Sequence, residues 1–192
     1  MAMLVLGLLI FLGAHSVRIF GEGWRTATVA RIGPGAWKGL YTLVSIAGFV
    51  LIVLGFRAAR ADTVVLWASP FWMKHLTALL MVLAMVLLAA AYVPRNSIKA
   101  RLHHPMVLAV KTWALAHLLA VGVLADVVLF GAFLVWAVLD FRSSRQRDRA
   151  NGTVYPPGTA AGTALTVAVG LVAWAVFAMV LHGLLIGVKP LG

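Results

Sequence analysis

Six apolar stretches, separated by short segments that are polar, basic or rich in glycine and proline, organise the chain. A helix rises about 1.5 Å per residue and the bilayer hydrocarbon is about 30 Å thick, so about 20 apolar residues cross it. The pattern predicts spans at residues 2–20, 37–56, 71–93, 105–121, 125–141 and 159–188. The last is long enough to cross with tilt or to begin as an interfacial turn. We therefore predict an all-α integral membrane protein, a bundle of about six transmembrane helices in one domain over residues 1–192.

The composition supports this prediction. The chain is 63% hydrophobic and 11% charged, which leaves too few charges for a water-soluble surface. A net charge of +11 points to nucleic acid in a soluble protein. Here the cations cluster between apolar stretches, so we expect the lipid bilayer as partner and no nucleic acid. The absence of cysteine excludes disulfides, iron–sulfur clusters and thiolate chemistry, and the five acids form no carboxylate cluster for an oxygen-ligated metal.

The basic residues also predict the topology. The loops after the first, third and fifth spans, with the adjoining helix ends, hold twelve of the sixteen, one of which, Lys111, falls within the predicted fourth span. The twelve are Arg18, Arg25, Arg31, Lys38, Arg95, Lys99, Arg101, Lys111, Arg142, Arg145, Arg147 and Arg149. Since basic loops stay inside, we expect these loops in the cytoplasm and both termini outside. Residues 140–158 read as a mobile cytoplasmic loop whose arginines contact lipid headgroups. The first stretch lacks the basic start and cleavage site of a signal peptide, and we take it as a transmembrane helix.

Histidines are the only plausible chemical groups. His117 follows Pro105, where a helix is expected to begin, by twelve residues, and so lies roughly 18 Å into the bilayer. An ionisable group at that depth faces the bundle interior or a cofactor. His15 lies in the first span, and the others are His75, His103, His104 and His182. A structural hydrogen bond explains any one of them, whereas two on different helices, with no acidic partner nearby, favour a shared ligand.

The chemistry of that ligand stays open at this point. Neutral imidazole is the commonest metal ligand, and haem between two imidazoles is one hypothesis. Zinc is disfavoured because no local cluster supplies four ligands. His15 is expected near the cytoplasmic end of its helix and His117 past the midplane, so tilt would have to bring them level. The depth of His75 matches that of His117 better.

Four motifs resemble one known family. They are Leu12-Gly13-Ala14-His15-Ser16-Val17-Arg18-Ile19-Phe20, Lys38-Gly39-Leu40-Tyr41-Thr42-Leu43-Val44-Ser45, Ile98-Lys99-Ala100-Arg101-Leu102-His103-His104-Pro105 and Lys111-Thr112-Trp113-Ala114-Leu115-Ala116-His117-Leu118-Leu119. Their order and spacing over residues 4–142 are similar to those of the NnrU family, whose members are associated with denitrification and nitric oxide handling. The resemblance implies a multi-pass protein of the bacterial inner membrane.

The same superfamily includes 15-cis-zeta-carotene isomerase, a membrane enzyme that holds haem b between two histidines. The resemblance implies that His15 and His117 are the axial ligands, because they match its His-Ser pair and its Trp-x-x-x-His stretch. Trp113 and His104 belong to the matching motifs and are expected at the cofactor. The isomerase has a cysteine three residues before the second histidine. This chain has Ala114 there, which puts isomerase activity in doubt.

A more distant likeness is to isoprenylcysteine methyltransferase-type enzymes, which bind S-adenosylmethionine. This chain lacks the arginine before His104 and the paired glutamates of those enzymes, which argues against methyl transfer. We expect a haem b protein that handles or senses nitric oxide, with a gaseous or lipophilic ligand and a redox partner. His75, His103 and His104 are candidates for contacts to cofactor or substrate. The alternatives are a haem-dependent isomerase of a lipophilic polyene such as zeta-carotene, and a cofactor-free scaffold or transporter.

Overall fold

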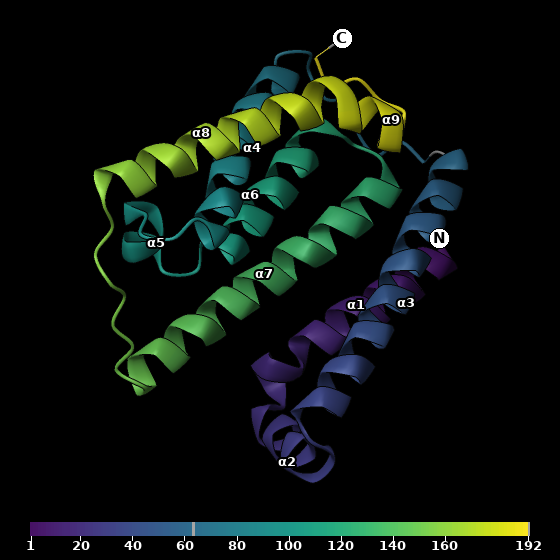
Figure 1. Cartoon of the computed structure of the whole chain (residues 1–192). Helices are drawn as coiled ribbons and strands as arrows, with labels where there is room; N and C mark the ends of the chain where they lie inside the picture. The colour runs from purple at the N-terminus through teal and green to yellow at the C-terminus, as the bar shows by residue number, and fades with distance from the viewer. Residues whose placement is uncertain (63, 192) are drawn as a thin grey trace.

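The computed structural model describes residues 1–62 and 64–191 as a bundle of helices (Figure 1). Isolated bridges join Val65 to Val123 and Asn96 to Thr159, but the described residues form no strand. The elements in chain order are α1 (Ala2–Phe20), α2 (Glu22–Ile32), α3 (Pro34–Ala61), α4 (Met73–Tyr92), α5 (Ser97–Leu102), α6 (Pro105–Ala120), α7 (Leu124–Ala150), α8 (Ala160–Val176), a π-helical turn (Phe177–Leu181) and α9 (His182–Ile186).

The helical membrane bundle that hydropathy predicts is confirmed. Helices α1, α3, α4, α7 and the stretch Ala160–Ile186 are each long and apolar enough to cross a membrane, and α6 is a shorter apolar helix. The bilayer interior has no water to hydrogen-bond with backbone N–H and C=O groups, so each span must satisfy them internally by forming a helix. The orientation of the termini stays a prediction.

The helices form two groups that share one contact. Helices α1, α3 and α7 pack together, α4 packs against α6 and α8, and the α6–α7 hairpin joins the groups (Figure 1). One end of the bundle gathers the end of α1, the start of α6 and the end of α7, where Arg147 donates to the carbonyl of Arg18. We call it the basic end. At the opposite end, Arg60 pairs with the buried Asp126 at 3.8 Å.

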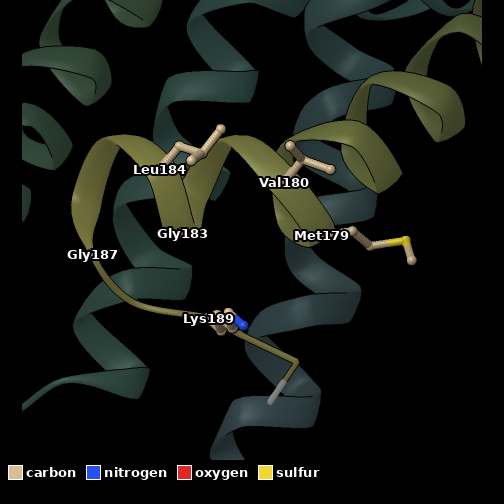
Figure 2. Close-up of a pocket in the computed structure, with 6 residues that line it drawn as sticks. All are labelled: Met179, Val180, Gly183, Leu184, Gly187 and Lys189. Atoms are coloured by element: carbon tan, nitrogen blue, oxygen red, sulfur yellow. The ribbon is translucent and has the colours of Figure 1, made fainter.

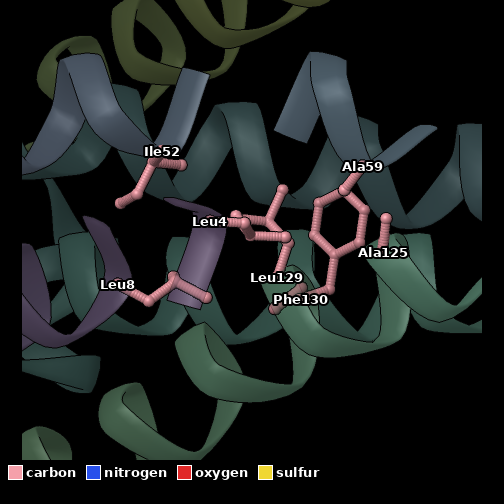
Figure 3. Packing of buried hydrophobic residues seen from close by; sticks show 8 residues of the cluster. Leu4, Leu8, Ile52, Ala59, Ala125, Leu129 and Phe130 are labelled. Atoms are coloured by element: carbon pink, nitrogen blue, oxygen red, sulfur yellow. The ribbon is translucent and has the colours of Figure 1, made fainter. Parts of the chain in front are cut away.

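Glycines bring α1 and α3 together. A Cβ on Gly7 would lie 2.6 Å from the backbone nitrogen of Ile52, and one on Gly48 would lie 2.7 Å from that of Phe11. Small residues let membrane helices approach closely, since lipid offers no hydrophobic drive for association. The buried cluster beside this contact joins α1 and α3 to α7, as Figure 3 shows, through Leu4, Leu8, Ile52, Ala59, Ala125, Leu129 and Phe130.

Three predictions about the segments outside the spans are corrected. The loop after the first span contains helix α2, which hydropathy does not detect because its composition is mixed. Residues 140–150 are not a mobile loop, since α7 continues to Ala150. The arginines expected at lipid headgroups have protein partners in two cases: Arg145 donates to His103, and Arg147 donates to Ser143 and Ser144. The apolar pattern ends where the membrane ends, but a helix continues while its residues favour it.

Candidate functional site

His15 sits on α1 with its ring held in one orientation. Its Nδ1 lies 2.7 Å from the carbonyl oxygen of Phe11, and its ring stacks on the Phe11 ring at 4.2 Å. A carbonyl only accepts hydrogen bonds, so Nδ1 carries the proton and Nε2 keeps its lone pair. Tyr41 and Trp136 lie beside the ring, with centroids at 5.2 and 6.0 Å. No described residue hydrogen-bonds to Nε2.

His117 repeats this arrangement on α6. Its Nδ1 lies 2.8 Å from the carbonyl oxygen of Trp113, one helical turn earlier. Its ring stacks on Phe130 of α7 at 4.5 Å with an interplanar angle of 22°. As for His15, the bond to the carbonyl leaves Nε2 as the acceptor atom, and no described residue occupies it. Trp113 therefore contacts His117 through its backbone carbonyl and also through its indole, with ring centroids 5.6 Å apart.

Helix α7 connects the two histidines. Within the described chain α1 and α6 do not pack on each other, whereas α7 packs on both. Phe133 of α7 meets Phe11 at 5.9 Å and Trp113 at 5.4 Å. His117 lies beside Phe130 and His15 beside Trp136, six residues apart, which corresponds to roughly 9 Å along the axis of α7. The structure thus places both histidines in one aromatic cluster but at different depths, as the sequence map expects.

A groove opens next to His15. It has a volume of about 270 Å³ between α1 and α3, and it is lined by Phe11, His15, Tyr41, Thr42, Ser45, Ile46 and Phe49. The hydroxyl oxygen of Ser45 is buried there, within reach of the Tyr41 phenol. A second cavity, of about 350 Å³, lies at the π-helical turn and α9, where Lys189 is the one charged residue in its lining (Figure 2). The groove at His15 is the one that adjoins a candidate ligand.

The hydrogen bonding of both histidines suits the haem that the resemblance implies. Metal-binding histidines donate their other ring nitrogen to a carbonyl or carboxylate, which is the arrangement of both His15 and His117. The described residues contain no group of three histidine, aspartate or glutamate side chains that would hold a bare metal ion. Two separate imidazoles suit an ion that already has equatorial ligands.

His103 and His104 belong to a different cluster, at the basic end. His104 Nε2 donates to the Asp148 carboxylate at 2.8 Å, Tyr155 donates to the same oxygen at 3.1 Å, and Arg145 donates to His103 Nδ1. The expectation that no acidic partner lies near the histidines is therefore wrong for His104. The continuation of α7 to Ala150 brings Asp148 to this position.

His75 and His182 make no ring contact or hydrogen bond with His15 or His117, and His182 lies within electrostatic range of His117. His75 contacts the ring of Phe71 at 5.4 Å, on α4. His182 Nδ1 donates to the carbonyl of Val188 at 2.6 Å. Aromatic residues of α7 complete the site. Their spacing of three residues, at Phe130, Phe133 and Trp136, places them on one helix face, which is the sequence signal for them.

The fold and the site define a multi-pass helical membrane protein whose interior presents oriented imidazoles. The chain belongs to the NnrU family, since a model of the family described as NnrU protein matches residues 3–190. This confirms the resemblance and extends it through the last span. No curated protein and no solved structure matches the chain.

Proposed function

We propose that this protein binds haem b through His15 and His117 and serves in the redox handling or sensing of nitric oxide in a bacterial inner membrane. One observation carries the haem assignment: on two different helices, an intramembrane histidine donates Nδ1–H to the carbonyl four residues earlier and leaves Nε2 open. The family resemblance supplies the link to nitric oxide.

Each residue has a stated role in this proposal. His15 and His117 hold the iron, and the carbonyls of Phe11 and Trp113 fix the tautomer and the direction of each ring. The rings of Phe130, Phe133 and Trp136 keep water away and fix α7 against both ligand helices. When bound, haem supplies a one-electron redox centre in an apolar interior.

The two histidines differ in their surroundings. His15 lines the groove between α1 and α3, while His117 is stacked on Phe130. A ligand dissolved in the bilayer therefore reaches His15 more readily than His117. Nitric oxide is small and apolar, and this access favours a ligand that partitions into lipid.

The groove also favours one alternative function, an isomerase acting on a lipophilic polyene. Its lining includes Phe11, Ile46 and Phe49, and the latter two are exposed on the outward side of α3. Against it stands Ala114, where the isomerase has cysteine. Conversion of zeta-carotene isomers in cells that make both the pigment and this protein would favour the isomerase.

Absorption spectra test the haem assignment. Protein purified from haem-replete cells is compared, oxidised and dithionite-reduced, with His15→Ala and His117→Ala, and with His75→Ala and His182→Ala as controls in other spans. We expect a Soret band with sharp reduced α and β bands, lost or shifted in the first pair and retained in the controls. Nitric oxide added to the reduced protein should shift the Soret band. A colourless wild-type protein would refute haem binding and favour a cofactor-free scaffold or transporter.

A further inference from the structure

The turn between α5 and α6 carries a strained residue. His103 has φ 71° and ψ −58°, and the amide of His104 donates to the carbonyl of Leu102 at 3.0 Å across it. This is a γ-turn with positive φ, a rare conformation that costs a non-glycine residue about 1–3 kcal/mol. Such a turn persists only where the surroundings hold it. Here it places two successive imidazoles toward the end of α7.

Three segments converge on one carboxylate oxygen there. His104 Nε2 lies 2.8 Å from Asp148 Oδ2, Tyr155 Oη lies 3.1 Å from it, and His103 Nδ1 lies 3.8 Å from it. The ring of Tyr155 stacks on His103 at 4.2 Å with an interplanar angle of 15°. The contacts join the α5–α6 turn, the last turns of α7 and the loop of residues 151–158, which rises to α8 (Figure 1).

These contacts fasten a part of α7 that α6 cannot support. Helix α7 has 27 residues and α6 has 16, so the hairpin leaves about eleven residues of α7, roughly 16 Å, beyond the start of α6. This extension carries Arg142, Arg145 and Asp148 and lies past the apolar part of the helix. The loop beyond it begins with the amide of Thr153 donating to the carbonyl of Asp148 at 2.9 Å, and its far end is anchored where the amide of Thr159 donates to the carbonyl of Arg95 at 2.7 Å.

We propose that His103, His104, Asp148 and Tyr155 form a proton-operated latch that closes when His104 is protonated and holds the end of α7 and the following loop against the α5–α6 turn. Imidazole is the side chain that changes charge between pH 5 and 8. An imidazolium donating to a carboxylate makes a charge-assisted hydrogen bond, about twice as strong as the neutral one.

The surrounding charges select His104 rather than His103 as the sensor. Arg145 donates to His103 Nδ1, and a protonated His103 has no lone pair with which to accept that bond. His104 faces Asp148 directly and has Asp140 within electrostatic range, while Lys111 lies over the Phe141 ring that meets His104 edge-on. The nearest charge to His104 is therefore negative.

The carboxylate stays charged over the pH range in which the latch works. Although partial desolvation opposes it, hydrogen bonds from Tyr155 and His104 and the charges of both histidines hold the pKa of Asp148 below its usual value. Desolvation and the neighbouring Asp148 raise the pKa of the Tyr155 phenol, which therefore remains a donor.

The latch extends beyond the proposed haem function and has a consequence for it. Helix α7 also carries Phe130 and Trp136, which contact His117 and His15. A change in how firmly the end of α7 is held therefore reaches the helix that lies against both histidines.

Spin labelling tests the latch, because the chain has no cysteine and a single one is a unique label site. A nitroxide on Val154→Cys reports the loop, since Val154 is 88% exposed. A nitroxide on Thr26→Cys, exposed on α2, is the control. We expect the loop label to tumble about twofold more slowly near pH 6 than near pH 8, the interval in which an imidazole changes charge. The control label should not respond.

Variants separate the two histidines. In the labelled chain, His104→Gln should abolish the pH response and His103→Gln should retain it, while Asp148→Asn should leave the loop mobile at both pH values. Circular dichroism and size-exclusion chromatography confirm that each variant keeps the helical fold. A loop label that ignores pH, or a pH response that survives His104→Gln, would overturn the latch. The readout does not involve haem, so it remains informative if the haem assignment fails.

Discussion

Gly48 provides a direct test of the α1–α3 contact on which His15 depends. Gly48→Ala adds one methyl group in the middle of α3, at the point where it meets Phe11 of α1. The carbonyl of Phe11 orients the His15 ring. A substitution on α3 is therefore expected to affect the bundle's stability and the site together.

The magnitude follows from the distances. The added Cβ would lie 2.7 Å from the Phe11 nitrogen and 3.0 Å from its Cα, whereas ordinary contacts begin at 3.4 Å. Both atoms belong to the backbone, so no side chain can rotate away and α1 must shift by roughly 0.7 Å. Overpacking of this kind costs about 1–3 kcal/mol. Replacing glycine by alanine within a helix returns about 1 kcal/mol of propensity.

Gly39→Ala is the matched control. Gly39 lies on the same helix, and a Cβ there meets nothing within 4 Å, so this variant gains the propensity without the clash. We expect Gly48→Ala to melt about 2–12 °C below Gly39→Ala, since 1 kcal/mol corresponds to about 2–4 °C for a chain of this size. Tryptophan fluorescence during heating in detergent measures the difference. A Gly48→Ala variant as stable as the control would refute the close approach of α1 and α3.

Three further predictions concern single polar residues. Asn96 is 2% exposed, accepts a hydrogen bond from the amide of Lys99 and donates to two carbonyls at the end of α4. Asn96→Ala should therefore destabilise the protein by about 1–3 kcal/mol in the same melting assay. An unchanged melting temperature would contradict this. Arg60→Gln should lower the melting temperature more than Arg60→Gln combined with Asp126→Asn, because the single variant leaves the Asp126 carboxylate, 3% exposed, without its cation. Equal decreases in melting temperature would exclude the ion pair as the cause. The lowered pKa of Asp148 means that its contribution to stability is present above the ordinary carboxyl pKa, near 3.9, and is lost as pH falls through the lower folded value. Acid should therefore release the Val154 label in the wild type, and Asp148→Asn, already released, should show no such step.

The sequence singles out His117, and the family resemblance adds His15 as its candidate partner, but the hydrogen bonds that orient the two rings are visible only in the structure. An ionisable residue far inside an apolar stretch marks His117 without any structure. Whether its ring is oriented depends on the rotamer and on the carbonyl of Trp113, which only coordinates supply. The Asp148 cluster was hidden for a different reason. Its members are 44 residues apart at His104 and Asp148, and their meeting requires both the continuation of α7 and the γ-turn at His103.

The sequence by itself determined that this is a helical membrane protein, where its apolar helices begin to within a few residues, and to which family it belongs. The physical reason is that hydropathy records the partition of each segment between lipid and water, and hydrocarbon permits such a segment little besides a helix. Tertiary structure alone decided which helices touch and at what rotation. Spans that are apolar on nearly every side carry little pattern to specify a face. Close packing at Gly48 and hydrogen bonds at Asp148 select the arrangement, and both depend on atoms that meet only after folding.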